Sequence, residues 1–319
     1  MRAGMAALLA LAVVAPAASA PAADGIAVGL TSPTAFDWDS FVAEDRGFFA
    51  AENLEVTVSY MAPDLPIKAL MAGTVDLAKS GTHFGIIAAA RGADVKIVGG
   101  SVYGYPYDLI SQPRFQSLAE LRGQTIAGAN PASITTVIFK DVMARQGVGP
   151  AEYSLLWVGG SKERFQALQS GQVAASLAES PPFNFRSVDS GKKVLLRYSE
   201  HVKDLQYTSY FASSKPGGHA RPLVARYLRA VIQAMRWLND PGNEKEAVQI
   251  LARRLKVEEA VAARSYAYLL TEHRAFRGEG RNDAGGLAEI VRLLAESRMI
   301  PKKEDWESFV DRSFTTPSR

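Results

Sequence analysis

The chain of 319 residues contains no cysteine. This absence excludes disulfide bonds, metal sites built from thiolates, a cysteine nucleophile and a lipid-modified N-terminal cysteine. Histidine is also scarce, and the four histidines, at positions 83, 201, 219 and 273, are too scattered to suggest a metal cluster. We therefore expect neither a bound metal nor a cofactor.

A strong charge of one sign is absent as well. The formal charge is +3, and without the first twenty residues the chain has 35 basic and 33 acidic residues. No basic run accompanies this small excess, so nucleic acid is not an expected partner. The motifs of serine hydrolases, phosphate-binding loops, dinucleotide-binding folds and zinc proteases are missing too, so we do not expect an enzyme.

Long hydrophobic runs are missing after the N-terminus, where the pattern is that of a secretory signal peptide over residues 1–20. Arg2 supplies a positive charge, residues 5–14 are apolar, and small residues end the segment at Ala20. A buried N-terminal helix is the alternative, but such a helix does not explain the small residues that end the segment at Ala20. No later segment reaches 18 apolar residues, so no membrane anchor is expected. We predict cleavage after Ala20 or Ala22 and a protein free in the periplasm.

Strand and helix patterns alternate through the first two thirds of the chain. The strands are predicted at residues 26–30, 54–60, 75–79, 95–99, 125–128, 154–158, 173–178, 192–197 and 207–212. Such alternation predicts parallel sheets with helices on their faces, hence an α/β fold. From Pro222 onward the chain is predicted to be helical. Residues 70–77 resemble residues 168–175, and although this short pattern occurs wherever a helix meets a strand, its place in two successive blocks favours two related lobes.

Several segments together resemble one known family. Residues 41–49 resemble its segment of an apolar residue, Val-Ala, three variable residues and Gly-Phe-Phe, and further matches follow at residues 53–56, 70–77, 121–127, 167–173 and 180–182. Their order and spacing are similar to those of the nitrate/sulfonate/taurine-type substrate-binding proteins of ABC importers, a family that includes binders of pyrimidine precursors. The chain departs from the family at Asp37, Trp38 and Ala174.

The resemblance implies the type II fold of periplasmic binding proteins. This fold has two doubly wound α/β lobes, a hinge with two chain crossings, and here a helical C-terminal extension. Lobe 1 would comprise residues 21–106 and 211–319, and lobe 2 residues 107–210. The crossings would lie near residues 105–107 and 209–210.

Candidate ligand-binding residues follow the predicted strands, because ligands in such sheets bind beyond the carboxyl ends of strands. They are Thr31, Ser32, Phe36, Trp38, Asp64, Ser80, Gly81, Thr82, His83, Asn130, Ser133, Glu179, Ser180, Pro181 and Tyr207. Thr82 and Ser133 begin predicted helices, whose free N–H groups suit an anion. Structural alternatives stay open, since Thr82 and Ser133 can simply cap helices and Trp38 and His83 can belong to the core.

These observations predict the periplasmic solute-binding component of an ABC import system. The expected partners are a small-molecule ligand and the membrane subunits of a permease, and the expected state is a monomer. The two helix starts favour a small organic anion, such as a sulfonate or an aromatic carboxylate. The aromatic loop at residues 36–38 makes a nitrogen heterocycle, such as a pyrimidine precursor, the alternative. A sensory solute-binding protein is a further alternative.

Overall fold

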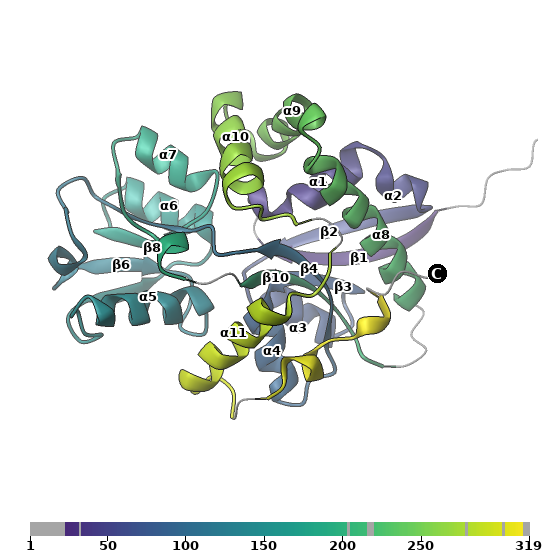
Figure 1. The fold of residues 1–319 in the computed structure, drawn as a ribbon, viewed down its shortest axis with the longest axis horizontal. Helices are drawn as coiled ribbons and strands as arrows, with labels where there is room; N and C mark the ends of the chain where they lie inside the picture. The colour runs from purple at the N-terminus through teal and green to yellow at the C-terminus, as the bar shows by residue number, and fades with distance from the viewer. Residues whose placement is uncertain are drawn as a thin grey trace, which may run out of the picture.

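The computed structural model describes residues 23–31, 33–202, 205–215, 220–277, 280–301 and 304–314. The predicted signal peptide, both predicted cleavage sites and Ser32 lie outside these residues. The described chain forms two lobes, each built on a five-stranded sheet with helices on both faces (Figure 1). The prediction of two doubly wound α/β lobes is therefore confirmed.

The first sheet has the strand order β2-β1-β3-β10-β4, in which only β10 runs against its neighbours. Its strands are β1 (Asp24–Thr31), β2 (Leu54–Met61), β3 (Leu77–Gly81), β4 (Lys96–Tyr103) and β10 (Gln206–Ala212). The central strands β3 and β10 are buried along their whole length. The edge strand β2 alternates apolar and polar residues, as expected for a strand with one solvated face.

Helices cover both faces of this sheet. They are α1 (Trp38–Asp45), α2 (Phe48–Ala51), α3 (Leu65–Met71), α4 (Thr82–Ala90), α8 (Ala220–Leu238), α9 (Glu244–Leu255), α10 (Glu259–Tyr266) and α11 (Ala284–Glu296). In Figure 1, α1, α2 and α8 lie on one face of the sheet and α3, α4 and α11 on the other. Packing is close, because a Cβ at Gly85 of α4 would come within 2.0 Å of the Phe211 ring of β10.

The second sheet repeats the arrangement of the first, with the order β7-β6-β8-β5-β9. Its elements are β5 (Asp108–Ser111), β6 (Thr125–Gly128), β7 (Ser154–Trp157), β8 (Ala175–Glu179), β9 (Lys193–Arg197), α5 (Ile134–Arg145), α6 (Ser161–Gln169) and α7 (Phe183–Asp189). Strand β6 is parallel to β7 and β8, whereas β5 is antiparallel to β8 and β9. Strands β3 and β8 hold the same position in the two sheets, and these are the strands that the two similar sequence segments enter.

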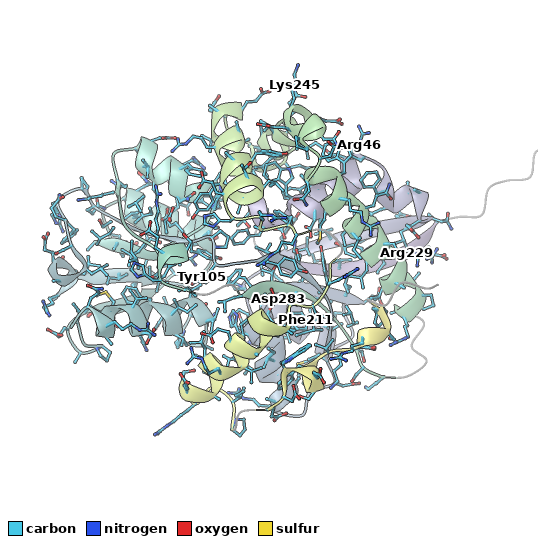
Figure 2. All side chains as sticks on the ribbon, in the orientation of Figure 1. Arg46, Tyr105, Phe211, Arg229, Lys245 and Asp283 are labelled. Atoms are coloured by element: carbon cyan, nitrogen blue, oxygen red, sulfur yellow. The ribbon has the colours of Figure 1, made fainter. Side chains whose placement is uncertain are left out.

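The chain passes between the lobes at residues 104–107, which lead from β4 to β5, and again at residues 198–202 and Leu205, which lie between β9 and β10. The first crossing includes residues 105–107, near which the resemblance places one. The second precedes β10, so the expected boundary between residues 210 and 211 falls inside that strand, all of which belongs to the first sheet. The aromatic alternation of residues 207–212 predicts a strand but does not tell which sheet the strand joins. Figure 2 shows Tyr105 of the first crossing between the lobes.

Helices of the C-terminal part reach the second lobe from both sides. Helix α10 contacts α7, and α11 contacts α5. A π-helical turn, Ala267–Glu272, extends α10 toward the second lobe. Within the ranges that the structure describes, no helix has the length and hydrophobicity needed to cross a membrane.

Candidate functional site

A cavity of about 70 Å³ lies between the lobes, beyond the carboxyl ends of β1, β3 and β6. The first lobe and the crossings line it with Thr31, Thr34, Phe36, Asp37, Pro63, Lys79, Ser80, Gly81, Phe84, Tyr107, Tyr207 and Thr208, and the second lobe with Ala129, Ser133, Thr135, Gly160, Ser161 and Arg164. Strand ends of both sheets therefore face one shared space between the lobes.

Three helices of the described chain begin at the cavity wall. The N-cap residues are Gly81 for α4, Ser133 for α5 and Gly160 for α6, and each of them lines the cavity. The first N–H groups of a helix have no partner within the helix and carry a partial positive charge. Ser133 accepts a hydrogen bond from the Thr135 backbone N–H at 3.3 Å, so its side chain caps α5. The same residue lines the cavity. The three helix starts form an electropositive wall suited to an anion.

The guanidinium of Arg164 adds a full positive charge to the same wall. The side chain is buried, and it donates hydrogen bonds to the carbonyl oxygens of Ala178 and Gly159 and to the hydroxyl of Ser161, at 2.7–3.0 Å. All these acceptors are neutral. In the described part of the chain the charge of Arg164 is thus held in place without a direct ion pair, and it remains available to an anionic ligand.

A buried lysine with two carboxylates forms the opposite wall. The Lys79 ammonium donates to the Phe36 carbonyl at 2.6 Å and to Asp39 Oδ1 at 2.7 Å, and it lies 3.4 Å from Asp37 Oδ1. All three charged side chains are almost fully buried. Burial raises the pKa of Asp37 to about 6, with Lys79 opposing the shift and Asp39 adding to it.

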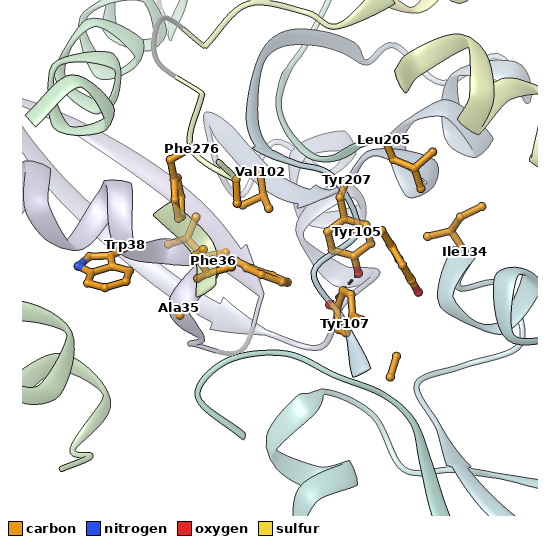
Figure 3. Packing of buried hydrophobic residues seen from close by; sticks show 14 of the residues in the cluster. Ala35, Phe36, Trp38, Val102, Tyr105, Tyr107, Ile134, Leu205, Tyr207 and Phe276 are labelled. Carbon is orange, nitrogen blue, oxygen red and sulfur yellow. Dashed lines mark hydrogen bonds between the residues drawn. The ribbon is translucent and has the colours of Figure 1, made fainter. Parts of the chain in front are cut away.

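Aromatic rings close the cavity at the crossings. Phe36 makes edge contacts with Tyr107 and Tyr207, with ring centroids 5.4 and 5.8 Å apart (Figure 3). Burial raises the pKa of both tyrosines, so their hydroxyls stay protonated at neutral pH. The cavity thus combines electropositive helix starts, one buried ion cluster and an aromatic rim.

This combination can be compared with known proteins. The family described as NMT1/THI5 like matches residues 39–244, which is more than half of the chain. The chain belongs to the NMT1/THI5-like family. This agrees with the resemblance to nitrate/sulfonate-type binding proteins that the sequence showed. No curated protein sequence matches the chain.

Solved structures share the NMT1/THI5-like fold at low identity. The alkanesulfonate-binding protein SsuA from Xanthomonas axonopodis pv. citri, bound to MOPS, is 19% identical with a TM-score of 0.72, and the match covers 92% of this chain and 99% of that one. The nitrate-binding protein NrtA from Synechocystis PCC 6803 is 17% identical with a TM-score of 0.71, covering 92% and 86%. The ligand-binding component of an ABC-type import system from Staphylococcus aureus, with zinc bound, is 15% identical with a TM-score of 0.78, covering 92% and 99%. These likenesses establish the fold.

Some of the residues predicted from sequence line the cavity of this NMT1/THI5-like protein, and others do not. Those that line it are Thr31, Phe36, Ser80, Gly81, Ser133 and Tyr207. Those placed elsewhere are Trp38, Asp64, Thr82, His83, Asn130, Glu179, Ser180 and Pro181. Ser32 lies outside the described residues.

Trp38 and Asp64 lie away from the cavity for different reasons. Trp38 is fully buried in the first lobe, where its indole N–H donates to the Ala247 carbonyl at 3.1 Å and its ring meets Tyr266 edge to face. Asp64 forms an ion pair with Lys68, at 2.6 Å, on the outside of α3. Trp38 therefore packs the helical extension onto α1, and Asp64 belongs to the protein surface.

Thr82 and His83 lie one layer behind the cavity wall. Thr82 donates to the Gln206 carbonyl and contacts the Ser209 hydroxyl at 2.7 Å, which ties α4 to β10. His83 is buried, and desolvation lowers its pKa to about 3, so the imidazole is neutral. A Cβ at position 81 would come within 2.5 Å of this imidazole, so the His83 ring requires glycine at the cavity wall.

The remaining residues support the second lobe or its contact with the first. The Asn130 carbonyl accepts from Thr136 Oγ1 at 2.9 Å. Glu179 is buried below the cavity and accepts from Ser187 at 2.7 Å. The Ser180 hydroxyl contacts that of Ser161 at 3.1 Å. The Pro181 carbonyl accepts from the Ala35 N–H across the lobes, at 3.3 Å.

Sequence reasoning missed Arg164 and the start of α6. The sequence of α6 is polar, so its arginine is not distinguishable by pattern from a solvated one. A usable signal was present, because Gly159-Gly160-Ser161 follows a predicted strand in the same way as the other candidate loops do.

Proposed function

We propose that this protein is the periplasmic solute-binding component of an ABC import system and that it captures a small organic anion between its lobes. The observation that carries this proposal is the convergence of three helix N-termini and the Arg164 guanidinium on one cavity. Two of the helix starts and Arg164 belong to the second lobe, and the third helix start belongs to the first. An anion is therefore bound by both lobes at once, which stabilises the closed arrangement.

The size of the cavity supports an anionic headgroup as the enclosed part of the ligand. Its volume of about 70 Å³ is well below the roughly 150 Å³ of a cavity that accommodates benzene. A sulfonate or carboxylate group fits this space, and an attached chain or ring points toward the aromatic rim. The sulfonate MOPS bound to SsuA and the name of NrtA support an oxyanion as the ligand class.

A nitrogen heterocycle is the second candidate, and the Asp37 carboxyl is the observation that favours it. Asp37 lines the cavity next to Phe36, where a carboxylate accepts an N–H and an aromatic ring stacks on a flat ligand. We propose no catalytic role for either ligand class. Among the residues that line the cavity in the described chain there is no histidine or cysteine, and none of the serines contacts a histidine.

The two crossings, residues 104–107 and residues 198–202 with Leu205, are proposed as the hinge. The lobes close over the ligand by rotation about these segments, and a permease accepts the closed form. The protein is proposed to act as a monomer in the periplasm after removal of residues 1–20 or 1–22. Mass spectrometry of the full-length gene product purified from the periplasm would give the cleavage site directly.

Ligand screening by thermal shift tests the proposal. Ethanesulfonate, benzenesulfonate, benzoate, nitrate and a pyrimidine are compared, and an anion at 100 times its Kd is expected to add about 2.7 kcal/mol of stability. Solution scattering is expected to show a monomer that becomes more compact with that anion. The variant Arg164→Lys is expected to bind at least tenfold more weakly, whereas Arg122→Lys, on an exposed ion pair with Glu152, serves as the control. Stabilisation by the pyrimidine alone would overturn the anion assignment.

A further inference from the structure

Two carboxylates share one lysine in the first-lobe wall of the cavity. Lys79 holds Asp39 at 2.7 Å and Asp37 at the longer distance of 3.4 Å. Asp39 also accepts from the Ser40 N–H, the Ser101 hydroxyl and the Tyr210 hydroxyl, at 2.7–2.8 Å. Asp39 thus accepts several hydrogen bonds and lies behind the wall. Asp37, whose contact with Lys79 is longer, is the carboxyl that faces the cavity.

The charges of the side chains that line the cavity, together with the Asp39 carboxyl behind them, cancel before any ligand binds. Lys79 and Arg164 carry two positive charges, and ionised Asp37 and Asp39 carry two negative charges. A monoanion bound there would leave one unbalanced negative charge in a buried site, which is strongly unfavourable. The balance is restored if one carboxyl takes up a proton.

We propose that Asp37 is the proton acceptor of the binding site, so that capture of one monoanion is accompanied by uptake of one proton from solvent onto the Asp37 carboxyl. The proton forms an O–H bond on Asp37, and this group changes from an acceptor that repels the anion into a donor. The inference rests on the proposed function, because it concerns the same cavity and the same ligand class. Asp37 is then a residue that determines specificity for anions over cations.

The surroundings of Asp37 favour proton uptake by this carboxyl over uptake by its neighbours. The groups that face it are the Thr34 N–H at 3.2 Å, Lys79 on β3, Asp39 on α1, Tyr60 on β2, Tyr107 at the first crossing and Tyr227 on α8. The pKa of each of these tyrosines is raised, so none of them is charged at neutral pH. Burial already raises the pKa of Asp37 to about 6, and an anion placed beside it raises the pKa further.

This coupling predicts a specific dependence of affinity on pH. Below about pH 6, Asp37 is protonated in both the free and the bound protein, so affinity is constant. Above that pH, the free protein must gain a proton to bind, and affinity falls by up to tenfold for each pH unit. A sulfonate or nitrate does not titrate in this range, so the ligand itself contributes nothing to the dependence.

Calorimetry tests the inference on the mature full chain. The probe is whichever of ethanesulfonate, benzenesulfonate and nitrate stabilises the protein most. Titrations at pH 7.5 in buffers of different ionisation enthalpy are expected to show uptake of close to one proton. The variant Asp37→Asn is expected to show no uptake, no pH dependence, and an affinity at pH 8 about tenfold or more above that of the parent. Asp141→Asn, on the exposed Asp141–Arg145 pair, is the control and should match the parent.

The outcomes separate this inference from the proposed function. If a probe binds the parent protein without proton uptake, the inference is overturned and the proposed function stands. If no anion binds at any pH, both are overturned. If Asp37→Asn is folded by circular dichroism and loses affinity at pH 8, Asp37 serves as a ligand acceptor, which overturns the inference. If that variant does not fold, the proton count of the parent protein still decides.

Discussion

Tyr107 donates its hydroxyl hydrogen to the hydroxyl oxygen of Tyr207 at 2.9 Å, which joins the last residue of the first crossing to β10, the strand that follows the second crossing. Their rings meet edge to face, with centroids 5.2 Å apart. Tyr105 packs against both rings, and Phe36 adds a ring from the first lobe. The same cluster therefore connects the crossings and forms the rim of the cavity.

Removal of the Tyr207 hydroxyl is expected to destabilise the protein. Tyr207→Phe leaves the buried Tyr107 hydroxyl without its acceptor, which costs about 1–3 kcal/mol of unfolding free energy. Urea unfolding measures this loss. Tyr105→Phe is the matched control, because within the described residues the buried Tyr105 hydroxyl has no hydrogen-bond partner, so its removal should leave stability unchanged or raise it. Equal losses in the two variants would contradict the assigned role of the hydroxyl pair.

Ser133 and Thr82 are expected to respond differently to replacement by alanine. Ser133 both caps α5 and lines the cavity, so Ser133→Ala should lower stability by about 1 kcal/mol and weaken anion binding several-fold. Thr82 faces β10, so Thr82→Ala should lower stability by a similar amount and leave affinity nearly unchanged. Calorimetric titration and urea unfolding of both variants separate the two effects. A loss of affinity in Thr82→Ala as large as that in Ser133→Ala would place the ligand against α4 instead.

Replacement of Trp38 is expected to lower the stability of the protein and to leave its affinity for the ligand nearly unchanged. Trp38→Phe removes the hydrogen bond to Ala247 and leaves a void against Tyr266, so unfolding free energy should fall by about 2–4 kcal/mol. Anion affinity should stay within about twofold of the parent. If affinity fell more than tenfold in a variant that retains its circular dichroism spectrum, Trp38 would have a role at the cavity that its burial does not suggest.

The fold was predicted from sequence patterns that extend over a few residues. Strand β6 begins and ends at the predicted residues, because a short apolar run beside a turn glycine is encoded within a few residues. Strand β5 was not predicted, although it is as long as β6. The place of β10 in the first sheet was also missed, because pairing with β3 and β4 depends on residues more than 100 positions away.

In the candidate site, too, some residues could be predicted from the nearby sequence, and others depend on residues far along the chain. Gly81 and Ser133 were predicted from the rule that ligands lie beyond strand ends, and both line the cavity. The side of α1 that carries Trp38 was not predictable, because the partner that buries it, Ala247, lies 209 positions further along the chain. The burial of Arg164 depends likewise on the carbonyl groups of Gly159 and of Ala178 in β8, to which it donates, and composition does not reveal these partners.

Glu179 is the residue from which we expect the clearest effect of pH on stability. Burial at the end of β8 raises its pKa to about 7, with the Ser187 hydroxyl and Arg164 opposing the shift. In the unfolded chain a glutamate titrates near 4.3. The folded state therefore binds this proton more tightly than the unfolded state does. The stabilisation is fully present below about pH 4 and is lost as the pH rises through about 7, and it amounts to at most about 3 kcal/mol.

Glu179→Gln isolates this contribution, because glutamine keeps the shape of the side chain and an acceptor for Ser187 but does not titrate. The unfolding free energy of the variant minus that of the parent should rise between pH 5 and pH 8, by up to about 3 kcal/mol, since only the parent must bury a carboxylate at the higher pH. Urea unfolding of both proteins at pH 5, 6, 7 and 8 measures the difference. Comparison at each pH cancels the contributions of Asp37 and Asp108, whose pKa values are also raised by burial. A difference that stays constant across this range would mean that Glu179 is ionised in the folded protein throughout, with Arg164 outweighing the effect of burial.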